Sequence, residues 1–88
     1  MADHAKDQIA AIVRQTVAVV ADVAIERLDG GVELIRDLKM DSLALYELVI
    51  ELEEHYRLQI SDEDIDRIKT VNDIVAFIGQ HLPDAAGN

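Results

Sequence analysis

The residues with the greatest chemical potential are one serine, three histidines and a run of carboxylates. Ser42 follows Asp41, and the histidines are His4, His55 and His81, of which His4 and His81 lie near the termini and are expected to be exposed. A serine nucleophile needs a general base within hydrogen-bond reach. His55 lies 13 residues further along the same expected helix, which is about 20 Å at 1.5 Å per residue. Since no G-x-S-x-G motif is present either, the sequence argues against a serine hydrolase.

The carboxylates do not form a convincing metal site. Asp62, Asp64 and Asp66 have the first spacings of a calcium-binding EF-hand loop. The position that requires glycine in that loop is Arg67, and the position that requires glutamate is Asp73. A dedicated Ca²⁺ site is therefore not expected, and the sequence contains no zinc motif and no phosphate-binding glycine-rich loop.

Hydrophobic periodicity predicts the elements that must position these residues. Apolar side chains recur at helical spacing in four segments. The expected helices are residues 5–20, 41–56, 61–68 and 70–82. No segment alternates with the period of a strand, so the predicted fold is an all-α four-helix bundle with a short third helix.

Polar side chains mark where three of these helices begin. Asp41 or Ser42 can cap the second helix, because a side-chain oxygen can accept a free backbone N–H of the first turn. The patterns Ser61-x-x-Asp64 and Thr70-x-x-Asp73 have the form of capping boxes. From composition and spacing alone, Ser42 is either such a cap or a hydroxyl that is modified, and the cap is the simpler reading.

A connection of about 20 residues separates the first two helices, which is longer than most helix–helix connections. Gly30-Gly31 interrupts it, and apolar residues follow. These anchors are Val32, Leu34, Ile35 and Leu38. They predict that the loop packs against the bundle and delivers the chain to Ser42.

The charge of the chain is strongly negative and concentrated. The 8 Lys and Arg residues stand against 18 Asp and Glu residues, and the formal net charge is −10. Such a surface repels phosphate backbones and anionic lipids, so neither a nucleic acid nor a membrane is an expected partner. Residues 41–66 contain nine acids and the single base Arg57, a net of −8. Because Glu47, Glu51 and Glu54 repel one another at helical spacing, this run is either a solvated face or a docking face for a basic protein.

The length and composition indicate one small domain. The chain has 88 residues and no cysteine, which excludes disulfides and cysteine-ligated metals. Neither an export signal nor a membrane-spanning run is visible. We expect a free-standing, cytoplasmic, monomeric domain over residues 1–82, followed by a flexible tail over residues 83–88.

The segment Arg36–Leu43, which reads R-D-L-K-M-D-S-L, closely resembles the attachment-site region of acyl carrier proteins. In that family a D-L-x-x-D-S-L motif precedes a helix that reads roughly E-L-V-x-x-L-E-E, and Tyr46–Glu54 matches this helix. The resemblance continues through Leu58–Glu63 and Lys69–Ile74, and covers residues 34–80 approximately. It implies a four-helix bundle whose Ser42 hydroxyl receives 4′-phosphopantetheine from coenzyme A through a separate phosphopantetheinyl transferase. Intermediates would then be carried as thioesters on the thiol of the cofactor, and the chain itself would not be an enzyme.

The resemblance also implies a docking face along the second helix and the start of the third. In the family, acidic residues at these positions contact basic patches on the transferase, on acyl-loading enzymes and on ketosynthases or other acyl-transfer enzymes. The matching acids here are Asp41, Glu47, Glu53, Glu54, Asp62 and Asp66, with apolar contacts from Leu43 and Ile50. The apolar residues behind this face are first of all expected to be core, although family members can part such helices to enclose an acyl chain. The expected core set is Leu34, Leu48, Leu52, Ile60, Ile68, Ile74 and Phe77.

Three departures from the family pattern bear on the pathway. Lys39 stands where carriers of primary fatty acid synthesis usually have glycine, Ala44 where they often have an acid, and Tyr46 where they often have Val or Ile. These departures favour a carrier of polyketide or other specialised intermediates over one of fatty acid synthesis. The alternative is a free-standing peptidyl or aminoacyl carrier of nonribosomal peptide synthesis, which shares the fold and the serine chemistry.

Overall fold

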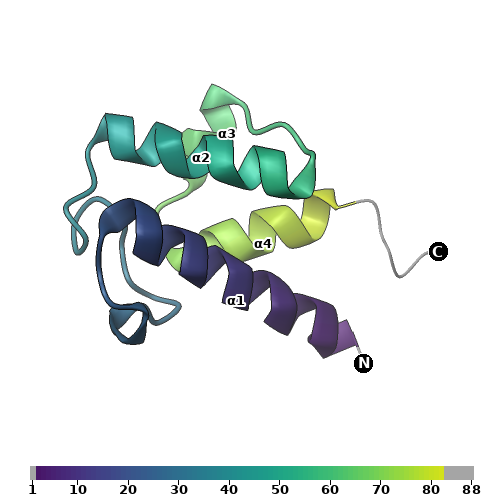
Figure 1. The fold of residues 1–88 in the computed structure, drawn as a ribbon. Helices are drawn as coiled ribbons and strands as arrows, with labels where there is room; N and C mark the ends of the chain where they lie inside the picture. Colours follow the sequence, from purple (N-terminus) through teal and green to yellow (C-terminus); the bar gives the residue numbers. More distant parts are fainter. Residues whose placement is uncertain (1, 83–88) are drawn as a thin grey trace.

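The computed structural model describes residues 2–82, with side-chain environments from Asp7 onward. Met1, the predicted tail 83–88 and the side chain of His4 lie outside the described residues. The elements are α1 (Ala2–Ala21), the 3₁₀ turn η1 (Ile25–Arg27), α2 (Ser42–Tyr56), α3 (Asp62–Arg67) and α4 (Val71–His81) (Figure 1). Residues 2–82 contain no strand, and the prediction of an all-α four-helix bundle is confirmed. None of the described helices is long and apolar enough to cross a membrane.

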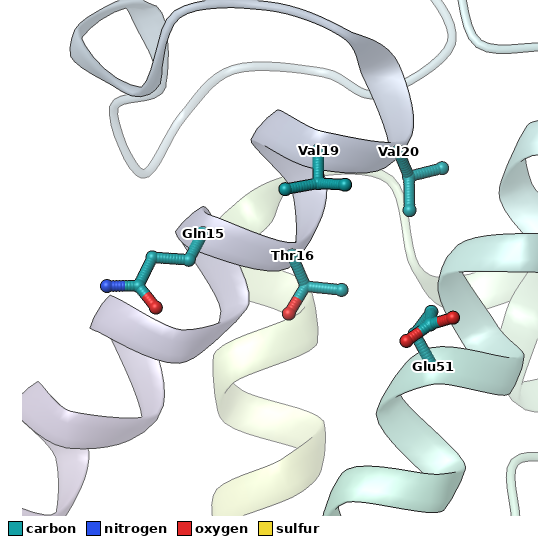
Figure 2. A pocket seen from close by; sticks show the side chains of 5 residues that line it. All are labelled: Gln15, Thr16, Val19, Val20 and Glu51. Carbon is teal, nitrogen blue, oxygen red and sulfur yellow. The ribbon is translucent and has the colours of Figure 1, made fainter.

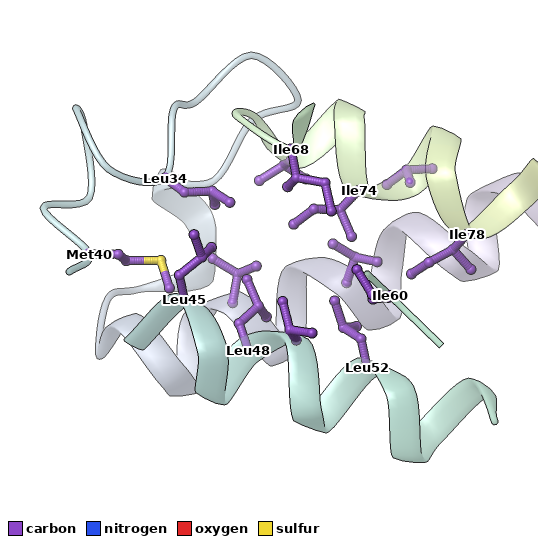
Figure 3. Packing of buried hydrophobic residues seen from close by; sticks show 14 of the residues in the cluster. Leu34, Met40, Leu45, Leu48, Leu52, Ile60, Ile68, Ile74 and Ile78 are labelled. Atoms are coloured by element: carbon purple, nitrogen blue, oxygen red, sulfur yellow. The ribbon is translucent and has the colours of Figure 1, made fainter. Parts of the chain in front are cut away.

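The three longer helices enclose one apolar core. α1 packs against both α2 and α4, and the short α3 lies in the connection between α2 and α4 (Figure 1). Six of the seven predicted core residues are buried in a single cluster with residues of α1 and the loop (Figure 3). Phe77 was expected to be buried as well, but it is only half-buried. Its ring instead stacks on the ring of His81, one turn later in α4, with ring centroids 4.0 Å apart.

α2 is amphipathic, and its two ends are fixed by local chemistry. Leu45, Leu48 and Leu52 lie on its buried face, as the helical spacing predicts. The carboxylate of Asp41 accepts a hydrogen bond from the Ala44 N–H at 2.8 Å, so Asp41 is the cap and Ser42 is the first helical residue. From the sequence alone, either Asp41 or Ser42 could have been the cap of this helix.

Both predicted capping boxes are present. The Ser61 hydroxyl accepts the N–H of Asp64 at 3.1 Å, and the Thr70 hydroxyl accepts the N–H of Asp73 at 3.1 Å. Both aspartates reach back to the N–H of the capping residue. Ile68, expected inside the third helix, instead forms its C-cap, since its φ and ψ are extended.

The connection between α1 and α2 packs down as predicted, with one exception. Leu34 is buried and Leu38 half-buried, whereas Ile35 is 61% exposed, so its expected role as an anchor is wrong. The N–H groups of Asp37 and Leu38 both donate to the Glu33 carbonyl, at 2.9 and 3.2 Å, which closes a helix-like turn. Residues four apart share a face of such a turn, so Leu34 and Leu38 point inward while Ile35 faces out.

Backbone hydrogen bonds tie this loop to the start of α4. The Leu34 N–H donates to the Lys69 carbonyl at 2.9 Å, and the Asn72 N–H donates to the Gly30 carbonyl at 2.9 Å. Glu33 and Thr70 form an isolated antiparallel bridge between these contacts. The loop that leads to Ser42 is therefore held by hydrogen bonds to the start of α4 as well as by its buried apolar side chains.

Candidate functional site

The Ser42 hydroxyl lies exposed in the first turn of α2. Asp41 satisfies the N–H of Ala44 with its carboxylate and the N–H of Leu45 with its carbonyl at 2.9 Å. Within the described residues, the N–H groups of Ser42 and Leu43 have no protein acceptor. The site is thus an accessible hydroxyl beside two free donors at the positive end of a 15-residue helix.

No described histidine is placed to activate this hydroxyl. His55 lies in the last turn of α2, where its ring meets Tyr56 edge-on with centroids 4.8 Å apart. His81 is exposed, as predicted, at the end of α4, with its Nδ1 2.9 Å from the Phe77 carbonyl oxygen. A serine without a base can accept a group in a reaction that another protein catalyses, but it has no means of its own to attack a substrate.

Two of the acids considered for a calcium loop, Asp64 and Asp73, instead complete the capping boxes of α3 and α4. Among the residues described, no group of three His, Asp or Glu side chains is gathered as a metal site would require. Asp64 accepts the Ser61 hydroxyl at 2.9 Å, and this hydrogen bond is the main reason that its pKa lies below the usual range. The Lys69 N–H, 3.0 Å from the Asp73 carboxylate, chiefly lowers the pKa of Asp73 in the same way. Both carboxylates therefore act as caps for α3 and α4.

Most of the predicted docking residues are exposed on α2 and α3. Leu43 is 68% and Ile50 50% exposed, although both are large apolar side chains. Five of the six predicted acids share this exposure: Asp41, Glu47, Glu54, Asp62 and Asp66. Asp41, Glu47 and Glu54 are spread along α2 from its cap to its last turn, and Asp62 and Asp66 lie on α3, so a partner that contacts the α2 acids covers the helix that begins at Ser42.

Glu53 is the exception among the predicted docking acids. It is half-buried, and its Oε2 accepts the backbone N–H of Ile60 at 2.8 Å. This hydrogen bond closes the turn between α2 and α3. Glu53 therefore has a structural role in this turn. The sequence did not predict that role, because no local motif links a glutamate to an N–H seven residues later.

Two further exposed apolar residues were not predicted as site residues. They are Ile35 in the loop, 61% exposed, and Tyr46 in α2, 48% exposed. A signal for Tyr46 was present, since it is three residues after Leu43 and four before Ile50, so these side chains are neighbours on the helix surface. The remaining large exposed apolar side chain, Val19, lies elsewhere, in a shallow groove where α1 meets α2 beside Glu51 (Figure 2).

A pocket of about 300 Å³ opens between the loop, the start of α2 and the end of α3 with the residues that follow it. Its apolar lining includes Leu45, Ile65 and Ile68, while Arg36 and Lys69 are among its charged lining residues. Ser42 does not line this pocket.

The surroundings of Ser42 fit a phosphodiester attached to its oxygen. The hydroxyl is accessible, and the two free N–H groups of the first helical turn can donate to phosphate oxygens. No described acid is hydrogen-bonded to the hydroxyl, and the nearest one in sequence, Asp41, is committed to the Ala44 N–H. A phosphodiester can therefore be attached to the Ser42 oxygen without a change in the backbone.

Comparison with known proteins agrees with this geometry. A protein family described as "phosphopantetheine attachment site" matches residues 11–78, more than three quarters of the chain. The solution structure of the apo doublet acyl carrier protein from prodigiosin biosynthesis is similar, with a TM-score of 0.72 and 26% sequence identity. The match covers 89% of this chain but only 39% of that one.

Proposed function

Because the chain belongs to the phosphopantetheine attachment site family, whose members carry 4′-phosphopantetheine covalently, we propose that Ser42 is the attachment residue. The family is one of non-catalytic carrier domains. On this proposal the protein holds biosynthetic intermediates as thioesters on the thiol of the cofactor, and it presents them to separate enzymes.

The state of the hydroxyl groups is the observation that carries this assignment. The chain has two serines and two threonines, and the described structure engages three of these four hydroxyls locally. Ser61 and Thr70 are capping-box residues, and Thr16 donates to the Ile12 carbonyl at 2.8 Å. Ser42 alone has an exposed hydroxyl without such a bond, and it alone follows the Asp-Leu-x-x-Asp pattern.

Ser42 and Asp41 have different roles in the attachment of phosphopantetheine. The Ser42 oxygen forms the new bond to the phosphorus of coenzyme A that bears the pantetheine arm, and its proton passes to a base that the transferase supplies. The pyrophosphate bond of coenzyme A breaks in the same step, and adenosine 3′,5′-bisphosphate leaves. Asp41 fixes the first turn of α2 through the Ala44 N–H, so the hydroxyl is presented at a defined place. The cofactor supplies the reactive thiol, which this cysteine-free chain lacks.

The exposed residues beside Ser42 form the proposed docking face: Asp41, Leu43, Glu47, Ile50, Glu54, Asp62 and Asp66. Its apolar centre with acidic edges suits partners that present an apolar patch ringed by Lys and Arg. The partners are a phosphopantetheinyl transferase, an acyl-loading enzyme, and a ketosynthase or other acyl-transfer enzyme. We propose a monomeric, cytoplasmic carrier.

The cargo is proposed to be a polyketide or other specialised acyl intermediate. The similarity to a prodigiosin carrier and the departures at Lys39, Ala44 and Tyr46 support this class. The acidic α2 and the D-S-L sequence at Ser42 favour an acyl over a peptidyl cargo. Mass spectrometry after incubation with acyl-loading or aminoacyl-loading enzymes separates these two alternatives.

The attachment is tested by intact mass before and after incubation with coenzyme A and a broad-specificity phosphopantetheinyl transferase. We expect the wild-type protein to gain the mass of one phosphopantetheine, Ser61→Ala to gain the same, and Ser42→Ala to gain nothing. Because Asp41 and not Ser42 caps α2, Ser42→Ala should keep its free energy of unfolding within about 0.5 kcal/mol. A modified Ser42→Ala variant would refute the site, and an unmodified apo wild type, with a control carrier modified, would refute the function.

A further inference from the structure

Lys39 adopts a backbone conformation that ordinarily favours glycine. Its φ is 60°, in the left-handed region, where a Cβ atom crowds the following carbonyl. The residue is exposed and lies three residues before Ser42, in the loop that the turn at Glu33 and the contact with Lys69 hold in place. Asp22 and Arg57 also have a positive φ, but they directly follow α1 and α2, where helices commonly end in this conformation. Lys39 instead lies inside the loop next to Ser42, where such a conformation motivates a search for a function.

The charges around Lys39 leave its ammonium group unpaired. Asp37 accepts the Glu33 N–H at 2.9 Å, and Asp41 accepts the Ala44 N–H at 2.8 Å. The neighbouring cation, Arg36, is 3.8 Å from the Glu33 carboxylate. Within the part of the chain that the structure describes, Lys39 takes part in no salt bridge.

We propose that Lys39 is a positioning residue that pairs with the phosphodiester of the arm attached to Ser42. This inference rests on the proposed function, because it needs the arm at Ser42. Three trans peptide steps limit the distance between the two Cα atoms to about 11 Å. The flexible four-carbon stem of a lysine, together with the Ser42 Oγ and the phosphate, spans much of that distance from the two sides.

A pairing between Lys39 and the phosphodiester would reduce the charge repulsion that modification of Ser42 introduces. Modification of Ser42 adds a negative charge directly after Asp41, in a protein of net charge −10. The ammonium group of Lys39 offsets that charge on one side, and the free N–H groups of Ser42 and Leu43 offset it on the other. The first atoms of the arm are then held at the end of α2 and not repelled from it.

¹³C NMR of the lysine side chains, with and without the arm, tests the pairing directly. The chain has three lysines, Lys6, Lys39 and Lys69, and Lys→Arg variants assign their ε-carbon signals. The ε-carbon signal of Lys39 should shift at low salt when the arm is attached, because an anion then lies close to the ammonium group. Asp37, Asp41, Glu33 and Arg36 are present in both forms, so their effects cancel in this difference.

Lys69 is the matched control, since it is also exposed but belongs to the segment between α3 and α4 and not to the loop before Ser42. Its ε-carbon signal should stay in place, and the Lys39 shift should shrink at about 1 M salt, where the Debye length is about 3 Å. The ³¹P resonance of the phosphodiester should also move in Lys39→Gln but not in Lys69→Gln. Equal shifts at both lysines, or an unshifted Lys39 in protein that carries the arm, would overturn the inference. Failure to attach the arm at Ser42 would instead overturn the proposed function, and this inference with it.

Discussion

Glu53 provides the sharpest test of how the site is held together. Its carboxylate accepts the Ile60 N–H at 2.8 Å in a half-buried setting, next to the buried Ile60 side chain. A hydrogen bond to a charged acceptor is worth about 1.5–3 kcal/mol when buried, and about 1 kcal/mol in more exposed settings. We therefore expect Glu53→Ala to lower the free energy of unfolding by about 1–2 kcal/mol, because the Ile60 N–H loses its partner.

The assay is urea unfolding followed by circular dichroism, with thermal unfolding as a second measure. For a domain of this size each kcal/mol corresponds to roughly 4–8 °C in Tm. Glu53→Gln keeps an acceptor oxygen and should lose less than Glu53→Ala. Glu54→Ala is the matched control, since Glu54 is the adjacent exposed acid, and it should stay within about 0.5 kcal/mol of the wild type. Equal stability of Glu53→Ala and Glu54→Ala would refute the role given to this hydrogen bond.

Two further predictions concern pH and docking. The pKa of Asp73 is lowered in the folded state, chiefly by the Lys69 N–H, so its stabilising effect is present above the unfolded pKa of about 3.9 and is lost as the pH falls through the folded value. Stability measured between pH 7 and about pH 3 should fall less steeply in Asp73→Asn than in the wild type, and identical slopes would contradict this. Glu47→Lys should raise the KM of the transferase several-fold at low salt, whereas Glu26→Lys, the same charge change on η1, should not. Equal KM values for these two variants would count against the α2 face.

Local patterns explain why so much of the helical fold could be predicted. The periodicity of Leu45, Leu48 and Leu52 and the two capping boxes depend on residues at most one or two turns apart. Ser42 is proposed as the attachment residue from its sequence motif, and the structure adds that Asp41 takes the capping role.

The features that could not be predicted depend on longer contacts or on turn geometry. Glu53 binds an N–H beyond the end of its own helix, and the Glu33–Thr70 bridge joins residues that are far apart in the chain. Ile35 faces outward because of the turn at Glu33, although its type suggested an anchor. The left-handed φ of Lys39 also gives a physical reason for the glycine that acyl carriers usually have there.

The hydrogen bonds between the loop and the start of α4 make the site-bearing part of the chain a closed segment. Gly30 and Asn72 are bonded at 2.9 Å, so a stretch that contains the loop, α2 and α3 begins and ends at one point of the fold. A chimera that exchanges this stretch between two carriers would join backbones that already meet, and would need to match only the core side chains toward α1 and α4. Recombination at these two positions could therefore transfer Ser42, Lys39 and the proposed docking face as one unit, without moving the helices that support them.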